Sequence, residues 1–582
     1  MKPSRHEQES PAAATARVSS TSAAVASKPG ATSASRPSVG MAVLFFAVLT
    51  AVLTWPQVLH PASVPDNVDS YFNMWRLAWV AHQLPRDPLH LFDANMFYPS
   101  RNTLAYSDAI LLQGVAGAPL VWLGIPVVFV YNLLIFGGFV LSAVGMFLLV
   151  RDLTGRADAA FISGIVFAFA PYRFDHYVHL ELLWAPWMPL ALLMLHRTLK
   201  SGRLRDGVWT GVFVAAQGLS CIYYVVFFAT ILVVFVPVML VGRLTRTRRR
   251  AAVALLAGAI VAAAVLLPYA APYRTARADV GERRSGEAAL YAAGPKHYLA
   301  AMPQSLLYGR LTGPFGRHEK RLFPGVAVVL LVAIGLWPPL DRTRLAYAVA
   351  LAVAVDMSFG FRGLLFERLR EHVMLYRGLR VPARVGQHVL LALAVLAGFG
   401  VSRLAAWFRE HRPAWSAVAV ASLGGVIICE YLMAPLSLVA VETTPGPVYR
   451  WLLQQPPGVV AEFPMPSRHY VPFHDAEYEY FSTFHWRPLA NGYSGMYTAA
   501  YDHLLAEVSA FPSGASLAAL RAVGVDLLIV HERFYGKELY RSVTRALDQR
   551  DDVTAYGPFA DGPFAIRAYR LLPRSGGVVP RF

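Results

Sequence analysis

Acidic residues gather in one stretch of this chain, between Pro65 and Asp108. The stretch carries three arginines but five aspartates, namely Asp66, Asp69, Asp87, Asp93 and Asp108. The whole chain has the opposite balance, with 53 Lys and Arg against 36 Asp and Glu. Grouped carboxylates can act as general bases or bind divalent cations. We therefore take this stretch as the first candidate for an active site.

The same stretch is rich in aromatic residues, and apolar positions recur at helical spacing between Tyr71 and Leu84. This pattern predicts a helix that lies on a membrane surface. Carboxylates held close to a bilayer are costly unless they are used, which favours a function for the set. The alternative for any one of these aspartates is a solvated loop residue without a chemical role.

The composition predicts a polytopic membrane protein. Of the 582 residues, 56% are hydrophobic and 15% are charged, and several apolar runs are long enough to cross a bilayer. The formal charge of +17 comes largely from arginines in short loops between these runs, as the positive-inside rule predicts. Nucleic acid is therefore not an expected partner, whereas the lipid bilayer is. Both cysteines, Cys221 and Cys429, lie in apolar runs, so we expect no disulfide framework.

The apolar runs predict about eleven membrane-spanning helices. A further apolar piece at 109–123 is predicted to be re-entrant or interfacial. The longest run, 208–241, exceeds one span and is expected to break near Cys221. The expected spans are 41–59, 127–150, 159–172, 182–199, the two halves of 208–241, 251–271, 322–340, 345–361, 389–408 and 416–434.

Three regions follow from these patterns. Residues 1–38 are predicted to be a disordered cytoplasmic tail. Residues 39–436 form the multi-spanning domain, with an outer loop at 61–110. Residues 442–582 are predicted to be a soluble α/β domain outside the membrane, with helices at 448–454 and 516–523 and strands at 459–463, 526–530 and 564–572. With a cytoplasmic N-terminus, the acidic stretch and the loops 173–181 and 273–321 share the outer face of the cytoplasmic membrane.

Several motifs resemble those of bacterial polytopic glycosyltransferases of the GT-C type. They are Asp69-Ser70-Tyr71-Phe72-Asn73-Met74-Trp75, Leu91 to Pro99, Leu104 to Asp108, Pro171 to His176 with His179, Trp187 to Leu190, Leu379 to Arg384, and Asn491 to Gly495. The resemblance covers most of residues 40–535. It implies an all-α GT-C-like membrane domain, a polyprenyl-phosphate-linked sugar as donor, and a lipid, glycan or protein acceptor. It also implies that a carboxylate of the first loop serves as base or metal ligand.

Sugar transfer with inversion needs a carboxylate to take the acceptor's proton. Asp69 is our predicted base, with Asp66 as the alternative and Asp108 as a second acid that shapes the acceptor site. Asn73, Trp75, Asp93 and Glu181 are predicted to contact substrate. The grouped carboxylates are compatible with Mg²⁺ or Mn²⁺, but the stretch has no compact Asp-x-Asp pattern, so metal dependence stays open.

Basic residues on the outer face are the predicted contacts for the donor phosphate. One set is Arg173, His176 and His179, although His176 and His179 also have the spacing of a two-histidine metal site or of a hydrogen-bonded interfacial pair. The other set is Arg377, Arg380 and Arg384, whose planar guanidinium groups suit phosphate. Anchoring to lipid head groups is the alternative for these arginines.

Two other classes of function remain alternatives. A transporter or flippase of lipid-linked glycans would need ionisable residues within the spans, and only Asp356 and Glu430 meet that condition. A non-catalytic scaffold would bind glycan through the C-terminal domain, with Asn491-Gly492-Tyr493 and the aromatic residues Tyr478, Tyr480, Phe481, Phe484 and Trp486 as the sugar contacts. Packing against the membrane domain is the alternative for these residues.

Overall fold

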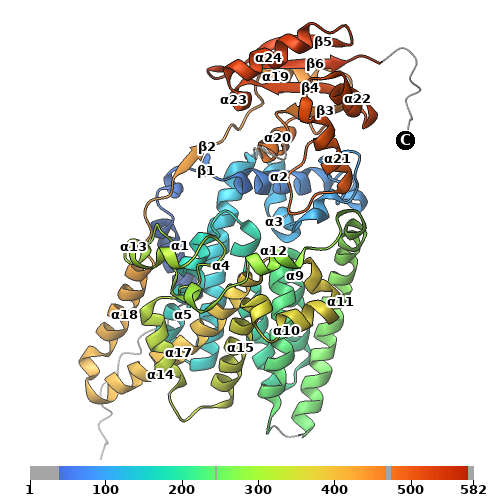
Figure 1. Ribbon diagram of the computed structural model, residues 1–582. Coiled ribbons are helices and arrows are strands. Elements are labelled where there is room, and N and C mark those ends of the chain that lie inside the picture. Colours follow the sequence, from blue (N-terminus) through green and yellow to red (C-terminus); the bar gives the residue numbers. More distant parts are fainter. Residues whose placement is uncertain (1–37, 243–244, 467–473, 574–582) are drawn as a thin grey trace, which may run out of the picture. The chain divides into compact units, whose positions relative to one another are not determined.

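The computed structural model describes residues 38–242, 245–466 and 474–573 (Figure 1). The predicted tail at 1–38 therefore lies outside the described residues, apart from Ser38. The side chain of Ser38 accepts a hydrogen bond from the amide of Met41 at 3.1 Å and begins the first helix.

The multi-spanning region is helical. Its first helices are α1 (Val39–Leu53), α2 (Val68–Gln83), α3 (Leu111–Trp122), α4 (Val127–Thr154), α5 (Ala157–Phe169), α6 (Pro171–Asp175), α7 (Leu180–Leu183), α8 (Trp187–Ser201), α9 (Leu204–Ser220), α10 (Ile222–Leu240) and α11 (Thr245–Val280). They are followed by α12 (Ser285–Leu290), α13 (Gly309–Thr312), α14 (Val326–Leu336), α15 (Arg342–Ser358), α16 (Phe366–His372), α17 (Gly386–His411) and α18 (Ser416–Glu430). Each predicted span coincides largely with one of these helices.

The chain is a multi-pass membrane protein. Among the described residues, five helices are long and apolar enough to cross a membrane, namely α4, α10, α11, α17 and α18. The apolar helices α1, α3 and α14 are shorter, so the number of about eleven spans stays a prediction. The expected break in the run 208–241 is confirmed, because Cys221 has extended backbone angles between α9 and α10.

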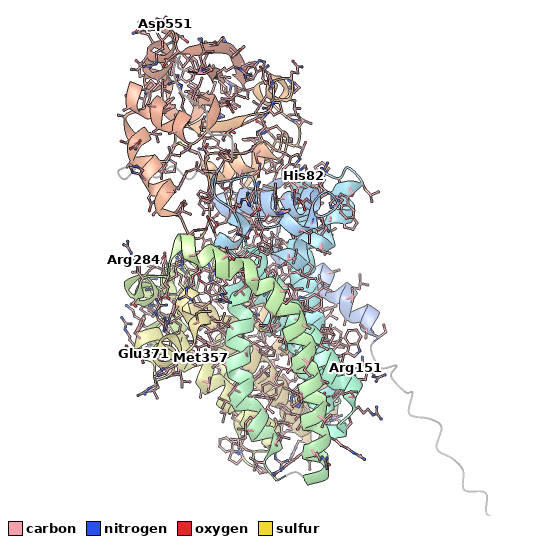
Figure 2. All side chains as sticks on the ribbon, turned by 90° about the vertical axis from the view of Figure 1, so that its right-hand side faces the viewer. His82, Arg151, Arg284, Met357, Glu371 and Asp551 are labelled. Atoms are coloured by element: carbon pink, nitrogen blue, oxygen red, sulfur yellow. The ribbon has the colours of Figure 1, made fainter. Side chains whose placement is uncertain are left out.

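Glycines allow α9 and α11 to pack closely. A Cβ atom on Gly211 would lie 1.9 Å from the carbonyl oxygen of Gly258, and one on Gly207 would lie 2.1 Å from the carbonyl oxygen of Ala254. Small residues at these positions bring the two helix backbones together, as is common in membrane proteins. Figure 2 shows these helices running side by side along the bundle.

The C-terminal region combines helices with a four-stranded sheet of order β3-β4-β6-β5, in which only β3 and β4 are parallel. Its strands are β3 (Val459–Phe463), β4 (Val525–His531), β5 (Val553–Asp561) and β6 (Phe564–Leu571). Its helices are α19 (Pro447–Leu453), α20 (Asp475–Ser482), α21 (Ala499–Glu507), α22 (Gly514–Ala522), α23 (Glu532–Tyr535) and α24 (Lys537–Asp548). The two predicted helices and three predicted strands are confirmed, whereas β5, α20, α21, α23 and α24 were not predicted.

Two features join the C-terminal region to the first loop. Strand β1 (Ser63–Pro65) pairs antiparallel with β2 (Leu438–Ala440), which precedes the C-terminal region. Helix α2 contacts α20, and the ring of His82 stacks on Trp486 at 3.9 Å. Figure 2 labels His82 near this contact and Asp551 at the far end of the C-terminal region. The acidic loop therefore lies between the helix bundle and the sheet (Figure 1).

Candidate active site

Helix α2 holds Asp69 in its first turn. The side chain of Asn67 caps the helix by accepting a hydrogen bond from the amide of Asp69 at 2.9 Å. A carboxylate in the first turn is favoured by the positive end of the helix dipole. The Asp69 side chain remains 26% exposed, so a substrate can reach it.

Two side chains from distant parts of the chain hold the Asp69 carboxylate. The hydroxyl of Tyr493 donates to Asp69 Oδ1 at 2.9 Å. His179 Nε2 lies 3.3 Å from Asp69 Oδ2. Tyr493 is itself fixed, because its amide donates to Glu479 Oε1 on α20 at 2.6 Å. Such a pair of partners orients a carboxylate for proton transfer.

Three histidines lie together beside Asp69. The ring centroids of His176, His179 and His318 are 5.6 to 6.0 Å apart. His318 Nε2 lies 3.0 Å from the backbone oxygen of Asp175. Neither ring nitrogen of His176 has a hydrogen-bond partner among the described residues, although its Nε2 lies 3.7 Å from Glu319. Burial holds the pKa of His176 well below its ordinary value, so this ring is neutral.

A buried ion pair closes the far side of the histidine cluster. Arg384 donates to both carboxylate oxygens of Glu319, with Nη2 to Oε1 at 2.5 Å and Nε to Oε2 at 3.1 Å. Burial alone would raise the pKa of Glu319, but the charge and hydrogen bonds of Arg384 outweigh it and hold this pKa below its ordinary value. Next to it, Arg321 pairs with Asp175 at 2.7 Å, whose pKa burial nevertheless raises.

Arg76 connects α2 with the loops that follow. Its guanidinium donates to Asn73 Oδ1 at 2.7 Å, to Glu181 Oε2 at 3.2 Å and to the backbone oxygen of Asp108. Asp108 in turn accepts the amide of Ile222 at 2.8 Å, at the start of α10. Burial and the charge of Glu181 raise the pKa of Asp108 to about 6. Predicted residues Asn73, Glu181 and Asp108 thus meet in one buried network.

Asp66, Asp93 and Trp75 lie in other surroundings. Asp66 is exposed and precedes the helix, so it does not share a helical turn with Asp69. Asp93 accepts the amide of Asn102 at 2.8 Å within its own loop. Trp75 is buried, and its indole donates to Asn95 at 3.1 Å.

Arg173 is built into the packing of the helices. Its guanidinium donates to the backbone oxygens of Leu182 and Leu183 at 3.0 and 2.8 Å, and to the hydroxyl of Ser142 at 3.3 Å. It also lies over the ring of Phe139. This arginine is 1% exposed, and the predicted contact of Arg173 with the donor phosphate stays a prediction.

The side chain of Arg380, another of the predicted arginines, is 31% exposed. Its Nη1 lies 3.7 Å from Glu287, and its amide donates to the hydroxyl of Tyr223. Arg283, which sequence reasoning missed, lies 3.4 Å from the same Glu287 and donates to the backbone oxygen of Gly495. Two arginines thus share one glutamate, which leaves one positive charge in excess.

Arg377 lies beside this group and is directed elsewhere. It donates to the backbone oxygens of Arg370 and Glu371 at 3.2 and 2.9 Å, and its Nη1 lies 3.6 Å from Glu282. The predicted set of arginines therefore separates into Arg384 in the buried pair, Arg380 with Arg283, and Arg377 at the edge.

The described residues include no group of three or more His, Cys, Asp or Glu side chains arranged to hold a metal ion. Two of the three clustered histidines direct a ring nitrogen at another group. His179 Nε2 lies beside Asp69, and His318 Nε2 lies beside the backbone oxygen of Asp175. Dependence on Mg²⁺ or Mn²⁺ stays an expectation for experiment.

A family model described as a domain of unknown function, DUF6311, matches residues 39–361. The chain belongs to the DUF6311 family. That match covers the acidic loop, the histidine cluster and Glu319. No curated protein matches this DUF6311 chain in sequence.

Solved structures show the fold of this DUF6311 protein. The arabinofuranosyltransferase AftD from Mycobacteria is 15% identical, with a TM-score of 0.53, over 91% of this chain and 41% of AftD. ArnT from Cupriavidus metallidurans in the apo state is 15% identical with a TM-score of 0.52, over 91% of this chain and 98% of ArnT. ArnT bound to undecaprenyl phosphate gives 14% identity and a TM-score of 0.50 with the same coverage. The chain spans 41% of AftD, and it has the GT-C membrane glycosyltransferase fold.

Proposed function

We propose that this protein is a glycosyltransferase that moves a sugar from a polyprenyl-phosphate-linked donor to a hydroxyl of a lipid, glycan or protein acceptor. The reaction takes place at the outer face of the cytoplasmic membrane, with the N-terminus in the cytoplasm. The observation that carries this proposal is the position of Asp69, a reachable carboxylate between His179 and Tyr493, on a GT-C fold.

In the proposed reaction, Asp69 accepts the proton of the acceptor hydroxyl. The hydroxyl oxygen forms a bond to the anomeric carbon while the bond from that carbon to the phosphate oxygen breaks. The phosphate leaves with the electron pair of that bond. His179 and Tyr493 hold the carboxylate toward the acceptor. Asp66 is the alternative base, although its exposure outside the helix favours Asp69.

We assign the departing phosphate to Arg380 and Arg283. Both contact Glu287, and one positive charge remains to stabilise the phosphate. Arg283 donates to the backbone of Gly495, two residues after Tyr493, so one short segment touches the proposed base and the proposed phosphate contact. Arg173 and Arg384 are left out of this assignment because their guanidinium groups are already occupied.

The carboxylates within the helices argue against the transporter alternative. Glu430 accepts the hydroxyl of Tyr308 at 2.7 Å and the amide of Val326 at 3.0 Å, so it caps α14. Asp356 accepts the amides of Leu364 and Leu365. Both acids therefore accept backbone amides, a structural role that accounts for their place within the helices.

The proposal is tested with purified protein in nanodiscs and in sealed vesicles. Polyprenyl-phosphate-linked sugars are supplied with a membrane extract as acceptor source, with and without EDTA. We expect release of polyprenyl phosphate together with a new glycosidic bond, and loss on addition of EDTA would identify a metal requirement. Movement of the intact donor across the vesicle membrane without any new bond would overturn the proposal in favour of transport.

A further inference from the structure

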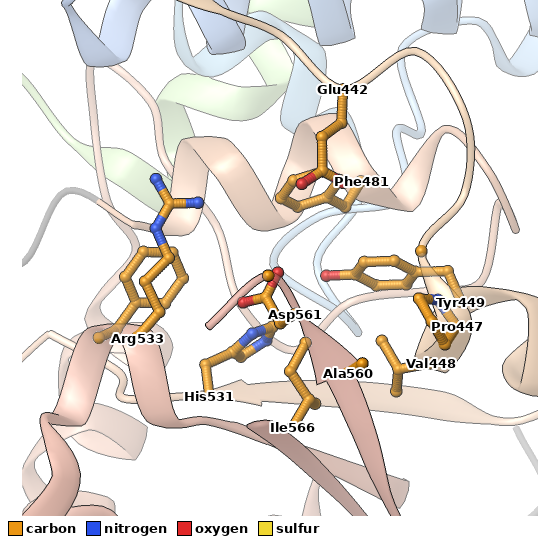
Figure 3. A pocket seen from close by; sticks show the side chains of 13 residues that line it. Glu442, Pro447, Val448, Tyr449, Phe481, His531, Arg533, Ala560, Asp561 and Ile566 are labelled. Carbon is orange, nitrogen blue, oxygen red and sulfur yellow. The ribbon is translucent and has the colours of Figure 1, made fainter. Parts of the chain in front are cut away.

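The C-terminal region contains a pocket away from Asp69, shown in Figure 3. It has a volume of about 100 Å³ and lies between the sheet, α20 and the segment that enters α19. Its wall and rim include Glu442, Tyr449, Phe481, His531, Arg533 and Asp561.

The base of the pocket is rigid and polar. His531 Nε2 lies 2.7 Å from Glu462 Oε2, and the hydroxyl of Tyr449 donates to the same oxygen at 2.9 Å. These three side chains are buried. A network with this many buried partners fixes the side chains that face the pocket.

The pocket also has an aromatic wall and a charged rim. The rings of Tyr449 and Phe481 stack at 5.2 Å with an angle of 22° between their planes. Figure 3 shows Glu442, Arg533 and Asp561 among the side chains that line the pocket. The side chain of Arg533 is 46% exposed, so it can adjust to an occupant.

We propose that this pocket binds one neutral sugar unit of a glycan. Aromatic side chains pack against the apolar face of a sugar ring. The carboxylates of Glu442 and Asp561 accept hydrogen bonds from sugar hydroxyls, and the guanidinium of Arg533 donates them. The inference concerns binding alone and does not require the protein to be a transferase.

Charge and size select this class of ligand. Two carboxylates against one guanidinium disfavour an anion such as phosphate. The volume limits the occupant to about one ring, so a longer glycan would enter with its end. Helix α20 carries Phe481 into the pocket and Glu479 toward Tyr493, so the pocket and the Asp69 site share one supporting helix.

The test uses the full chain in nanodiscs and saturation-transfer NMR, which detects weak ligands. The probes are the methyl glycosides of glucose, galactose, mannose and arabinose, with inorganic phosphate as a competitor. The test variant is Asp561→Asn, at the end of β5. Its matched control is Asp551→Asn, an exposed acid in the turn before β5.

We expect at least one glycoside to give a signal with the wild type and with Asp551→Asn. The signal should fall at least fivefold with Asp561→Asn and should not respond to phosphate. Absence of signal from every glycoside, an equal signal from Asp561→Asn and the control, or competition by phosphate would each overturn the proposal. These outcomes are independent of whether polyprenyl phosphate is released.

Discussion

The buried pair between Arg384 and Glu319 gives the sharpest prediction on stability. We consider Glu319→Gln, Arg384→Gln and the double variant. Each single change leaves one charge in the interior without its partner, because the side chains of Arg384 and Glu319 are only 7% and 4% exposed. The double variant removes both charges and leaves two amides that can bond to each other.

Removing one partner of a buried ion pair costs about 3–5 kcal/mol, because the remaining charge is neither solvated nor paired. We expect this loss for Glu319→Gln, which strands the guanidinium. The double variant should lose about 2–3 kcal/mol less than the sum of the single variants, since the two sites are directly coupled. The exposed pair of Arg197 and Asp152, at 2.7 Å, provides the control, and Arg197→Gln should cost about 0–1 kcal/mol.

The assay is equilibrium unfolding by SDS in mixed micelles, followed by far-ultraviolet circular dichroism, which gives the free energy of unfolding for each variant. A cost for Glu319→Gln no larger than that for Arg197→Gln would show that the pair of Arg384 and Glu319 does not stabilise the fold as predicted. Additive costs in the double variant would show that the two side chains are not coupled. In either case Arg384 would not be bound by Glu319, and it would become available to hold the donor phosphate, as the sequence predicts.

Three further predictions concern other parts of the molecule. Asp108→Asn removes a carboxylate whose pKa is raised from 3.8 to about 6. Above pH 6 the folded protein carries the unfavourable charged form, so the variant should be more stable than the wild type by up to about 3 kcal/mol at pH 8. The gain in stability should vanish near pH 4, and equal gains at pH 4 and pH 8 in SDS unfolding would contradict this prediction. Tyr493→Phe removes a hydrogen bond to the proposed base, so kcat should fall about 10- to 100-fold without a change in melting temperature, and an unchanged kcat would be evidence against the assigned role. Gly211→Val should prevent folding, because the valine side chain would meet the backbone of Gly258. The control variant Gly137→Val has open space around its side chain and should fold. Size-exclusion chromatography distinguishes folded from aggregated protein for the two variants.

The sequence predicted the apolar helices of the bundle, α19 and α22, and the strands β3, β4 and β6 because each depends on a local pattern. The break at Cys221 followed from the length of an apolar run, and the strand at 459–463 followed from its apolar residues. The short polar helix α20 and the exposed edge strand β5 carry no such pattern, so they were missed. The aromatic residues of the C-terminal region proved to be packing contacts in several cases, as with Trp486 on Trp79 and His82.

The site was only partly predictable for a different reason. Asp69 and His179 were named from the chain, but Tyr493 lies 424 residues from Asp69, and no local pattern shows that contact. The pair of Glu319 and Arg384 lies in two loops 65 residues apart, where the sequence shows only a polar segment. In a sequence, an arginine that binds phosphate cannot be distinguished from one whose guanidinium is bound within the protein. Arg384 and Arg173 were therefore assigned to phosphate, although Arg384 binds Glu319 and Arg173 binds backbone oxygens.

Asp69 is the proposed base of the sugar transfer. The most direct test is the single-turnover rate of polyprenyl-phosphate release from a polyprenyl-phosphate-linked sugar, measured for the wild type, Asp69→Asn and Asp66→Asn in nanodiscs. We predict that Asp69→Asn slows release by roughly 10²- to 10⁴-fold, whereas Asp66→Asn remains within about threefold of the wild type. Release by Asp69→Asn at the wild-type rate would show that Asp69 is not the base.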